Sequence, residues 1–207
     1  MSTQPAPPRR IGVFGGAFDP PHHGHTALAQ AALEHLGLDL LLVVPTGTAW
    51  HKSRTLSGAR HRLAMCALAF ENVPRVHIDD CEIMRSGPSY TVDTLEALHQ
   101  AYPGADFFLL MGQDQAQRLD TWSRASTLPQ LASLCVAARA AAEEDAEVAL
   151  PAHVRHVPMS PVPFSSSAIR AALAIAGDTS AMLAPAVARY IAQHRLYATT
   201  FPTENPD

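Results

Sequence analysis

Short apolar runs alternate along the chain with segments whose apolar residues recur at helical spacing. The runs with the length and composition of buried strands are Ile11–Phe14, Leu40–Val44, Arg75–Ile78, Asp106–Met111 and Leu134–Ala138. Helical spacing covers residues 24–36, 57–72 and 91–101, and the second of these has a predicted inward stripe of Leu63, Ala67 and Phe70. Continuous apolar strands separated by helices are typical of a parallel sheet covered on both faces. The pattern therefore predicts a doubly wound α/β fold whose ligands bind beyond the carboxyl ends of the strands.

The chain length and the placement of polar segments predict one domain. With 207 residues, the chain is close to the size of a single domain, about 100–200 residues. We expect a flexible, Pro-rich N-terminal segment over residues 1–10, one domain over 11–198 with a C-terminal helical part over about 165–198, and a flexible tail over 199–207. The Ala- and acid-rich stretch Ala140–Ala149 is expected to be a solvated helix or a loose loop.

Composition and charge narrow the class of protein. Apolar residues make up 47% and charged residues 16%, which is a globular rather than a disordered composition. A net charge of −4 gives no global basic field, so we expect no nucleic-acid partner. No apolar run reaches the ~18 residues of a membrane span, and the N-terminus has no apolar core of a secretory signal. Cys66, Cys81 and Cys135 form no CxxC pair, which favours reduced thiols and a cytoplasmic location.

The segment after the first strand carries the strongest chemical pattern in the chain. It runs from Gly15 to His25 with the sequence GGAFDPPHHGH. Its two glycines let the backbone approach a ligand, and outward-facing amides there can bind an anion. A helix is expected to begin near Gly24, and a helix N-terminus also favours phosphate. Because His22 and His25 are three positions apart, both imidazoles lie on one side of that helix start. The pattern predicts a phosphate-binding site.

Two other interpretations of these histidines are open. The helix start could carry histidines that have no chemical task, or His22 and His25 could bind a metal ion with Asp19 as the nearby third ligand. The metal site is the weaker interpretation, because no other convincing ligand lies near in the sequence. His23 lies between the pair and is expected to point elsewhere. We also expect Gly24 to leave room for a ligand against the backbone.

Three further segments place polar residues at strand ends or helix starts. Ser165–Ser167 precede a predicted helix, so one serine is expected to cap it, and Arg170 can reach phosphate beside that helix start. Gly112–Asp114 directly follows a strand, where Asp114 could bind ribose hydroxyls or cap the next helix. Pro88–Thr91 opens a helix and offers hydroxyls and free amides.

Two residues are notable for their type. Lys52 is the single lysine beside fourteen arginines, and it lies in the segment that follows the second strand. A point charge near phosphates suits a lysine, although the segment could also be only a mobile loop. Trp122 lies in a polar context, where its ring could offer a flat face to a heterocycle or belong to the core.

These motifs together resemble the HxGH nucleotidyltransferase superfamily and, within it, the bacterial nicotinate-nucleotide adenylyltransferases. The resemblance rests on the Gly15–His25 segment, on Pro88–Thr91 with Thr94-Leu95, on Gly112–Asp114, on Trp122 and on Ser165–Arg170. It covers the chain from about Ile11 to Tyr197. It implies a Rossmann-like parallel sheet of the nucleotidyltransferase type. It also implies transfer of the adenylyl group of ATP to nicotinate mononucleotide, which gives deamido-NAD and pyrophosphate in NAD biosynthesis.

The resemblance also assigns roles to residues. Catalytic roles fall to His22, His25, Lys52 and Arg170. ATP would be bound by Gly15, Gly16, Ala17, Phe18, His22, His25, Gly112, Asp114, Ser166 and Arg170. Nicotinate mononucleotide would be bound by Gly16, Lys52, Tyr90, Thr91, Trp122 and Ser123. Trp122 would stack on the pyridine, and the Thr91 region and the amide after Trp122 would meet its carboxylate. Mg²⁺ would be held mainly by the ATP phosphates, with no metal site on the protein.

The residues agree with this chemistry on physical grounds. The acceptor is a phosphate monoester with a second pKa of about 6, so it needs no general base near pH 7. Since the chain is acidic overall, charge on the phosphates must be neutralised locally, and we expect His22, His25, Lys52 and Arg170 to do this with Mg²⁺ and two helix N-termini.

Three positions depart from the family pattern, and two other functions remain open. Ala17 stands where Ser or Thr is usual, Trp50 where Pro is common, and Ala168 where Thr is usual. An adenylyl- or cytidylyltransferase for another phosphorylated acceptor, such as phosphopantetheine, is one alternative. A non-catalytic nucleotide-binding module on the same fold is the other. Assembly of the chain into a homo-oligomer is compatible with the nicotinate-nucleotide activity and with both alternative functions.

Overall fold

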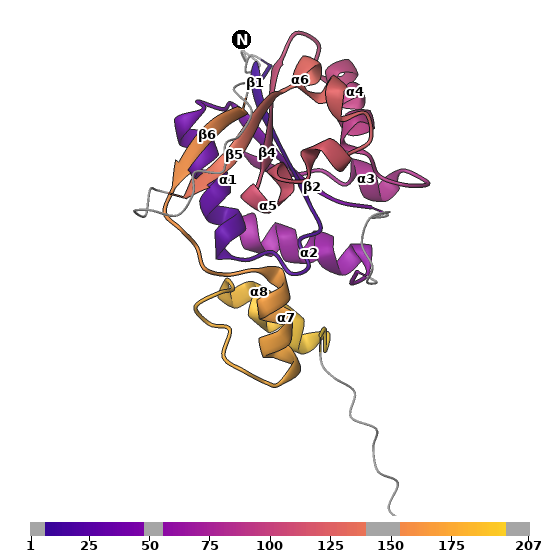
Figure 1. The fold of residues 1–207 in the computed structure, drawn as a ribbon. Coiled ribbons are helices and arrows are strands. Elements are labelled where there is room, and N and C mark those ends of the chain that lie inside the picture. Colours follow the sequence, from indigo (N-terminus) through magenta and orange to yellow (C-terminus); the bar gives the residue numbers. More distant parts are fainter. Residues whose placement is uncertain (1–6, 48–55, 140–153, 198–207) are drawn as a thin grey trace, which may run out of the picture.

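A computed structural model describes residues 7–47, 56–139 and 154–197. Its strands form one parallel sheet in the order β3-β2-β1-β4-β5-β6 (Figure 1). The strands are β1 (Arg10–Gly16), β2 (Leu40–Pro45), β3 (Val76–Ile78), β4 (Asp106–Met111), β5 (Ser133–Arg139) and β6 (Val154–Met159). This order is that of a doubly wound, dinucleotide-binding sheet, so the predicted fold class is confirmed.

Helices connect the strands and continue beyond the last one. They are α1 (His23–His35), α2 (Ala59–Phe70), α3 (Cys81–Met84), α4 (Thr91–Ala101), α5 (Gln113–Ala116), α6 (Leu128–Leu131), α7 (Ser166–Ala174) and α8 (Pro185–Gln193). Two short 3₁₀ turns, η1 (Leu119–Thr121) and η2 (Ala125–Thr127), lie between α5 and α6. None of the helices in this part of the chain has the length and apolar composition needed to cross a membrane.

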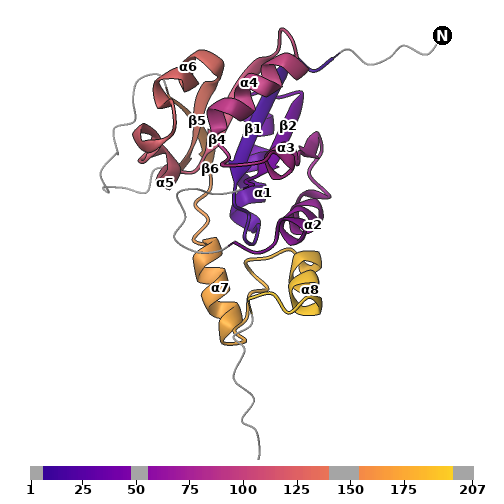
Figure 2. The same ribbon diagram turned by 90° about the vertical axis from the view of Figure 1, so that its right-hand side faces the viewer.

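Helices cover both faces of the sheet (Figures 1 and 2). Alternate residues of β2, β1, β4 and β5 supply the two cores. In β1, Phe14 packs with apolar side chains of α1 and α2, whereas Ile11 and Val13 pack with those of α4 and α6. Side chains alternate between faces along a strand, so a strand buried on both sides must be apolar throughout. This explains why the predicted apolar runs and the observed strands largely coincide.

The carboxyl ends of β1, β2 and β4 lie side by side at the centre of the sheet. Gly16 pairs with Pro45 in β2, and Phe14 pairs with Leu110 in β4. The order of the sheet reverses between β1 and β4, which is where such sheets bind ligands. The loops that follow these three strands are those in which the sequence placed its chemical motifs.

The C-terminal helices form a separate small core beside α2. Ile169 of α7 and Leu183, Val187 and Ile191 at α8 pack with Met65 of α2. Figures 1 and 2 show α7 and α8 together at one end of the molecule, next to α2. Within residues 165–197 the structure has α7 and α8, and their contact with Met65 joins them to α2.

Two sequence predictions on the fold need correction. Strand β6 was not predicted, because it is an edge strand in which only Val157 is fully buried, so its sequence lacks an apolar run. The stripe on α2 is also misplaced: Ala67 is exposed, and the fully buried residues are Arg62, Met65, Cys66 and Phe70. Arg62, which is not part of the predicted stripe, is 2% exposed.

Some predictions concern residues outside the described ranges. Lys52, Trp50, the stretch Ala140–Ala149 and the tail 199–207 all belong to this group. Strand β1 begins at Arg10, and the amides of Arg9 and Arg10 both donate to Asp39, at 2.8 and 2.9 Å. The first strand of the sheet thus begins one residue before position 11.

Candidate active site

His22 and His25 cap the start of α1, because each ring accepts a hydrogen bond from a backbone amide. His22 is the N-cap residue, and its Nδ1 accepts from the Gly24 amide at 3.1 Å. The His22 amide in turn donates to Nδ1 of His25 at 3.1 Å. The two rings lie 3.8 Å apart between centroids. A neutral imidazole whose Nδ1 accepts carries its proton on Nε2, so both rings present an Nε2–H donor.

The environment of His22 keeps its ring neutral. Burial, followed by the charge of His23, lowers the pKa of His22 from 6.5 to about 4. His22 is only 8% exposed. With its pKa lowered in this way, His22 near pH 7 offers a hydrogen-bond donor and carries no positive charge.

The same geometry weighs against a metal site at this position. A ring nitrogen that carries hydrogen has no lone pair for a metal, and the other nitrogen of each ring already accepts a backbone N–H. The third candidate ligand, Asp19, is buried and accepts from Tyr197 and from the Ser57 amide. Within residues 7–47, 56–139 and 154–197, no group of three or more His, Cys, Asp or Glu is placed to hold a metal ion.

The glycines around this helix start have different tasks. A Cβ on Gly15 would meet nothing within 4 Å, so its backbone faces open space, as a ligand-binding turn requires. A Cβ on Gly16 would lie 3.0 Å from the Phe18 ring. A Cβ on Gly24 would lie 3.0 Å from the His22 ring, so this glycine makes room for the histidine. The predicted room for a ligand at Gly24 is thus shared with the His22 ring.

The Phe18 side chain packs beneath the histidine pair as part of the core. Its φ is +46°, a left-handed value for a residue with a side chain, and its ring is 1% exposed. The ring packs edge-on against His25 with 5.0 Å between centroids and against Phe14 at 5.3 Å. The Phe18 side chain therefore belongs to the core, and only its backbone is available to a ligand.

The serine-rich segment attaches α7 to the turn between the glycines and the histidines. Ser165 is the predicted helix cap and accepts from the Ala168 amide at 3.1 Å. Ser166 donates to the Pro20 carbonyl at 2.9 Å. Arg170 donates to the Asp19 carbonyl at 2.6 Å and to the Ser167 hydroxyl at 2.9 Å. Residues about 150 positions apart in the sequence are thereby brought together at the end of β1.

Two residues that the sequence did not single out stabilise this turn. Arg62, 2% exposed, donates to the carbonyls of Ala17 at 3.1 Å and of Ser57 at 3.0 Å. Tyr197 donates its hydroxyl to the Asp19 carboxylate at 2.6 Å, and burial beside Asp19 raises the pKa of this tyrosine. No sequence signal marks either residue. Tyr197 bonds to a carboxylate that is distant in the sequence. Arg62 bonds to backbone carbonyls, and every residue type carries a backbone carbonyl.

The end of β4 supplies the second part of the site. Gly112 is the N-cap of α5, and a Cβ there would meet nothing within 4 Å. Asp114 is exposed in the first turn of α5. The alternative that Asp114 caps this helix is wrong, because Gly112 is the N-cap residue and no side chain caps it.

The predicted pyridine-binding residues come from two neighbouring segments. Tyr90 is the extended N-cap of α4, and Thr91 begins that helix. Trp122 ends η1, and its half-buried ring packs on the α4 side of the sheet. The Trp122 amide donates to the Leu119 carbonyl at 2.9 Å. The next amide, that of Ser123, is accordingly the candidate donor to a ligand.

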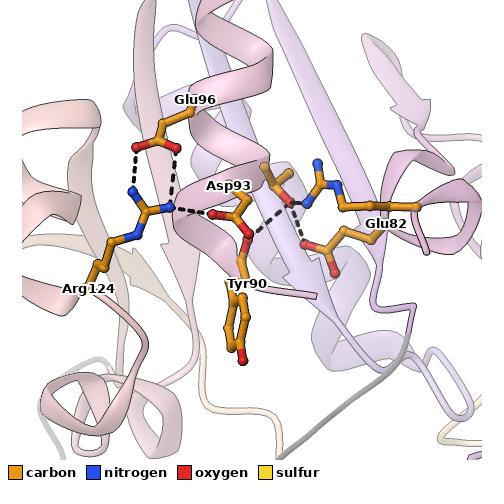
Figure 3. Close-up of polar contacts among 7 residues, drawn as sticks. Glu82, Tyr90, Asp93, Glu96 and Arg124 are labelled. Atoms are coloured by element: carbon orange, nitrogen blue, oxygen red, sulfur yellow. Dashed lines mark hydrogen bonds and ion pairs between the residues drawn. The ribbon is translucent and has the colours of Figure 1, made fainter. Parts of the chain in front are cut away.

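Charged contacts surround the start of α4 on two sides (Figure 3). Arg124 binds Asp93 and both carboxylate oxygens of Glu96, with Nη1–Oε1 at 2.8 Å. On the other side, the buried Thr94 hydroxyl donates to Glu82 at 2.9 Å. Burial raises the pKa of the Glu82 carboxyl. These contacts join α4 to the segment after η1 on one side and to α3, which follows β3, on the other.

Comparisons with known proteins give matches along most of the chain. The family model described as cytidylyltransferase-like matches residues 13–172. A probable nicotinate-nucleotide adenylyltransferase of Albidiferax ferrireducens is 51% identical over 196 residues, which cover 92% of this chain and 99% of that protein. The corresponding protein of Methylibium petroleiphilum is 45% identical over 201 residues, 93% of this chain and 94% of that protein.

Solved structures with the same fold include a Plasmodium falciparum enzyme. The structure described as nicotinic acid mononucleotide adenylyltransferase complexed with NaAD has a TM-score of 0.76 and 20% identity, over 91% of this chain and 97% of that one. At this identity the likeness supports the fold.

Proposed function

The chain belongs to the nicotinate-nucleotide adenylyltransferases of the cytidylyltransferase-like family, and we propose that the site at the ends of β1 and β4 carries out the family reaction. In that reaction ATP donates its adenylyl group to nicotinate mononucleotide, which yields nicotinate adenine dinucleotide and pyrophosphate. The observation that carries the assignment of residues is the pair of Nε2–H donors at the start of α1, beside the open backbone of Gly15.

The reaction needs alignment and charge stabilisation rather than proton abstraction. The acceptor phosphate is largely dianionic near pH 7, because its second pKa is about 6. Its oxygen attacks the α-phosphorus of ATP, and the bond from that phosphorus to the bridging oxygen of the β-phosphate breaks. Negative charge therefore grows on the leaving pyrophosphate. Donors fixed in advance stabilise such charge without reorganising.

The residues around Asp19 supply these fixed donors. His22 and His25 donate through Nε2–H, because backbone amides occupy both Nδ1 atoms. Arg170 adds a guanidinium that the Asp19 carbonyl and Ser167 already orient. The α1 N-terminus and the Gly15–Phe18 backbone complete the predicted triphosphate site. We assign ribose binding to Gly112 and Asp114, and Ser166 to the support of Arg170's helix.

The acceptor site is proposed at Tyr90–Thr91 and Trp122–Ser123. These residues offer N–H and O–H donors and an aromatic ring, which suit a pyridine carboxylate. An amide in its place would turn its NH₂ toward donors, and a buried unmatched polar group costs about 1–3 kcal/mol. We therefore propose that the acid is preferred over nicotinamide mononucleotide. Lys52 remains a proposed phosphate ligand outside the described residues.

Mg²⁺ is proposed to arrive with ATP. Hard cations prefer oxygen ligands, which the phosphates supply. Asp19, the carboxylate nearest to the histidines in the sequence, already accepts from Tyr197 and Ser57. When bound there, Mg²⁺ would neutralise phosphate charge. A cytoplasmic location is proposed from the three free thiols. Neither a nucleic-acid partner nor membrane binding is part of the proposal, and self-association is left to measurement.

The histidine assignment is tested by paired substitutions. His25→Ala should lower kcat by about 10²-fold, because it removes a donor aimed at growing charge. The matched control is His23→Ala, which keeps the main-chain bonds of His23 to the Met182 carbonyl and the Thr26 hydroxyl. The control should retain most of the turnover, measured as pyrophosphate release. Similar losses in both variants would contradict the assignment of the two Nε2–H donors.

A further inference from the structure

Arg124 joins two segments that are far apart in the sequence. It lies two residues after Trp122 and has a left-handed φ of +51°. Its guanidinium donates to both oxygens of Glu96, at 2.8 and 3.2 Å, and to Asp93. Both acceptors lie on the first two turns of α4, directly after Thr91. Figure 3 shows Arg124 reaching across to Asp93 and Glu96.

The two segments joined in this way differ in how firmly they are held. The start of α4 is attached to the protein interior through Thr94, which is 1% exposed and bonds to Glu82 and Arg85. The segment from Leu119 to Thr127 consists of two short 3₁₀ turns with local backbone bonds. Leu119 and Trp122 of this segment also pack on the core that α4 shares, and Arg124 adds a charged contact from the segment to α4.

This ion-pair cluster contributes little to global stability. The side chains of Arg124, Asp93 and Glu96 are 48%, 37% and 43% exposed. Exposed pairs of this kind add little to the free energy of unfolding, and salt screens them. The cluster also carries one positive charge against two negative charges. Without Arg124, two uncompensated carboxylates would lie beside the start of α4.

We propose that Arg124 is a positioning residue that determines the preference of the site for a pyridine carboxylate over the amide. It does so by holding Trp122 and Ser123 opposite Tyr90 and Thr91, and by balancing the charge of Asp93 and Glu96. The proposal rests on the proposed acceptor site. Removal of Arg124 should weaken the anionic acceptor more than the neutral amide, because both the displaced Ser123 amide and the uncompensated carboxylates act on the negative charge.

The test compares Arg124→Gln with Arg118→Gln. Arg118 is exposed, precedes η1 and gives the same loss of charge. In Arg124→Gln, the KM for nicotinate mononucleotide should rise about tenfold while the KM for ATP changes by less than about twofold, since a displaced contact acts on one substrate only. The ratio of kcat/KM for the acid to that for the amide should fall, with Tm unchanged within a few degrees.

The outcomes separate this inference from the function on which it rests. Equal effects of the two substitutions, an unchanged KM for the acid, or equal rises in the KM of ATP and of the acid would overturn the role of Arg124. Absence of turnover of nicotinate mononucleotide by the unmodified chain would overturn the proposed function itself.

Discussion

The buried, neutral state of His22 predicts a specific dependence of stability on pH. In the unfolded chain this imidazole has a pKa of 6.5, and in the folded protein burial lowers the pKa to about 4. Between these values the unfolded chain binds a proton at His22 that the folded protein does not bind. Stability from this residue is therefore complete above pH 6.5 and is lost as the pH falls toward 4. The full difference corresponds to about 3 kcal/mol.

The comparison of the unmodified chain with His22→Asn isolates this contribution. Asn also caps helix N-termini well but does not titrate. Urea unfolding would be measured for both proteins at a series of pH values from 4 to 8. The difference between their unfolding free energies should be constant above about pH 7 and should fall by about 3 kcal/mol on the way to pH 4. Parallel curves over the whole range would refute the neutral, buried state of His22.

Two further substitutions test the supports of the site. Gly47→Ala should lower the free energy of unfolding by about 1–3 kcal/mol or more, because its Cβ would lie 2.1 Å from the Glu82 carbonyl oxygen; urea unfolding with normal stability would contradict the packing of this loop on α3. Tyr197→Phe should raise the KM for ATP and lower stability by about 1–3 kcal/mol, because it removes a donor from the buried Asp19 carboxylate. Tyr190→Phe, which loses only a bond to His61, is its control, and equal effects on the KM for ATP would contradict a role of Tyr197 at the site.

Most of the fold could be predicted because burial on both faces leaves a direct trace in the sequence. The strand Asp106–Met111 and the helix Thr91–Ala101 match the predicted bounds. The edge strand β6 leaves no such trace, since one of its faces contacts solvent. The face of α2 was misjudged for a related reason: Arg62 satisfies its charge with carbonyl groups in the interior, and the sequence does not show where carbonyls gather.

The motifs of the candidate site could be predicted from the sequence, but the long-range contacts that hold them in place could not. The Gly15–His25 segment and Ser165–Arg170 were recognised because unusual residue types are clustered within each. Their contact through the Asp19 carbonyl and Arg170 depends on how α7 packs, which no local pattern encodes. Arg124 was missed for the same reason, because its partner Asp93 is 31 positions away. Long-range polar contacts are thus the part that required coordinates.

The most direct test of the account is turnover with both mononucleotides side by side. The purified chain would be incubated with ATP, Mg²⁺ and either nicotinate mononucleotide or nicotinamide mononucleotide, and pyrophosphate and dinucleotide would be measured. The account predicts release of pyrophosphate with the acid and a kcat/KM at least about tenfold higher for the acid, which requires only about 1.4 kcal/mol of discrimination. Equal efficiency with the amide would contradict the proposed carboxylate site at Tyr90–Thr91 and Trp122–Ser123, and no turnover with either would contradict the assigned reaction.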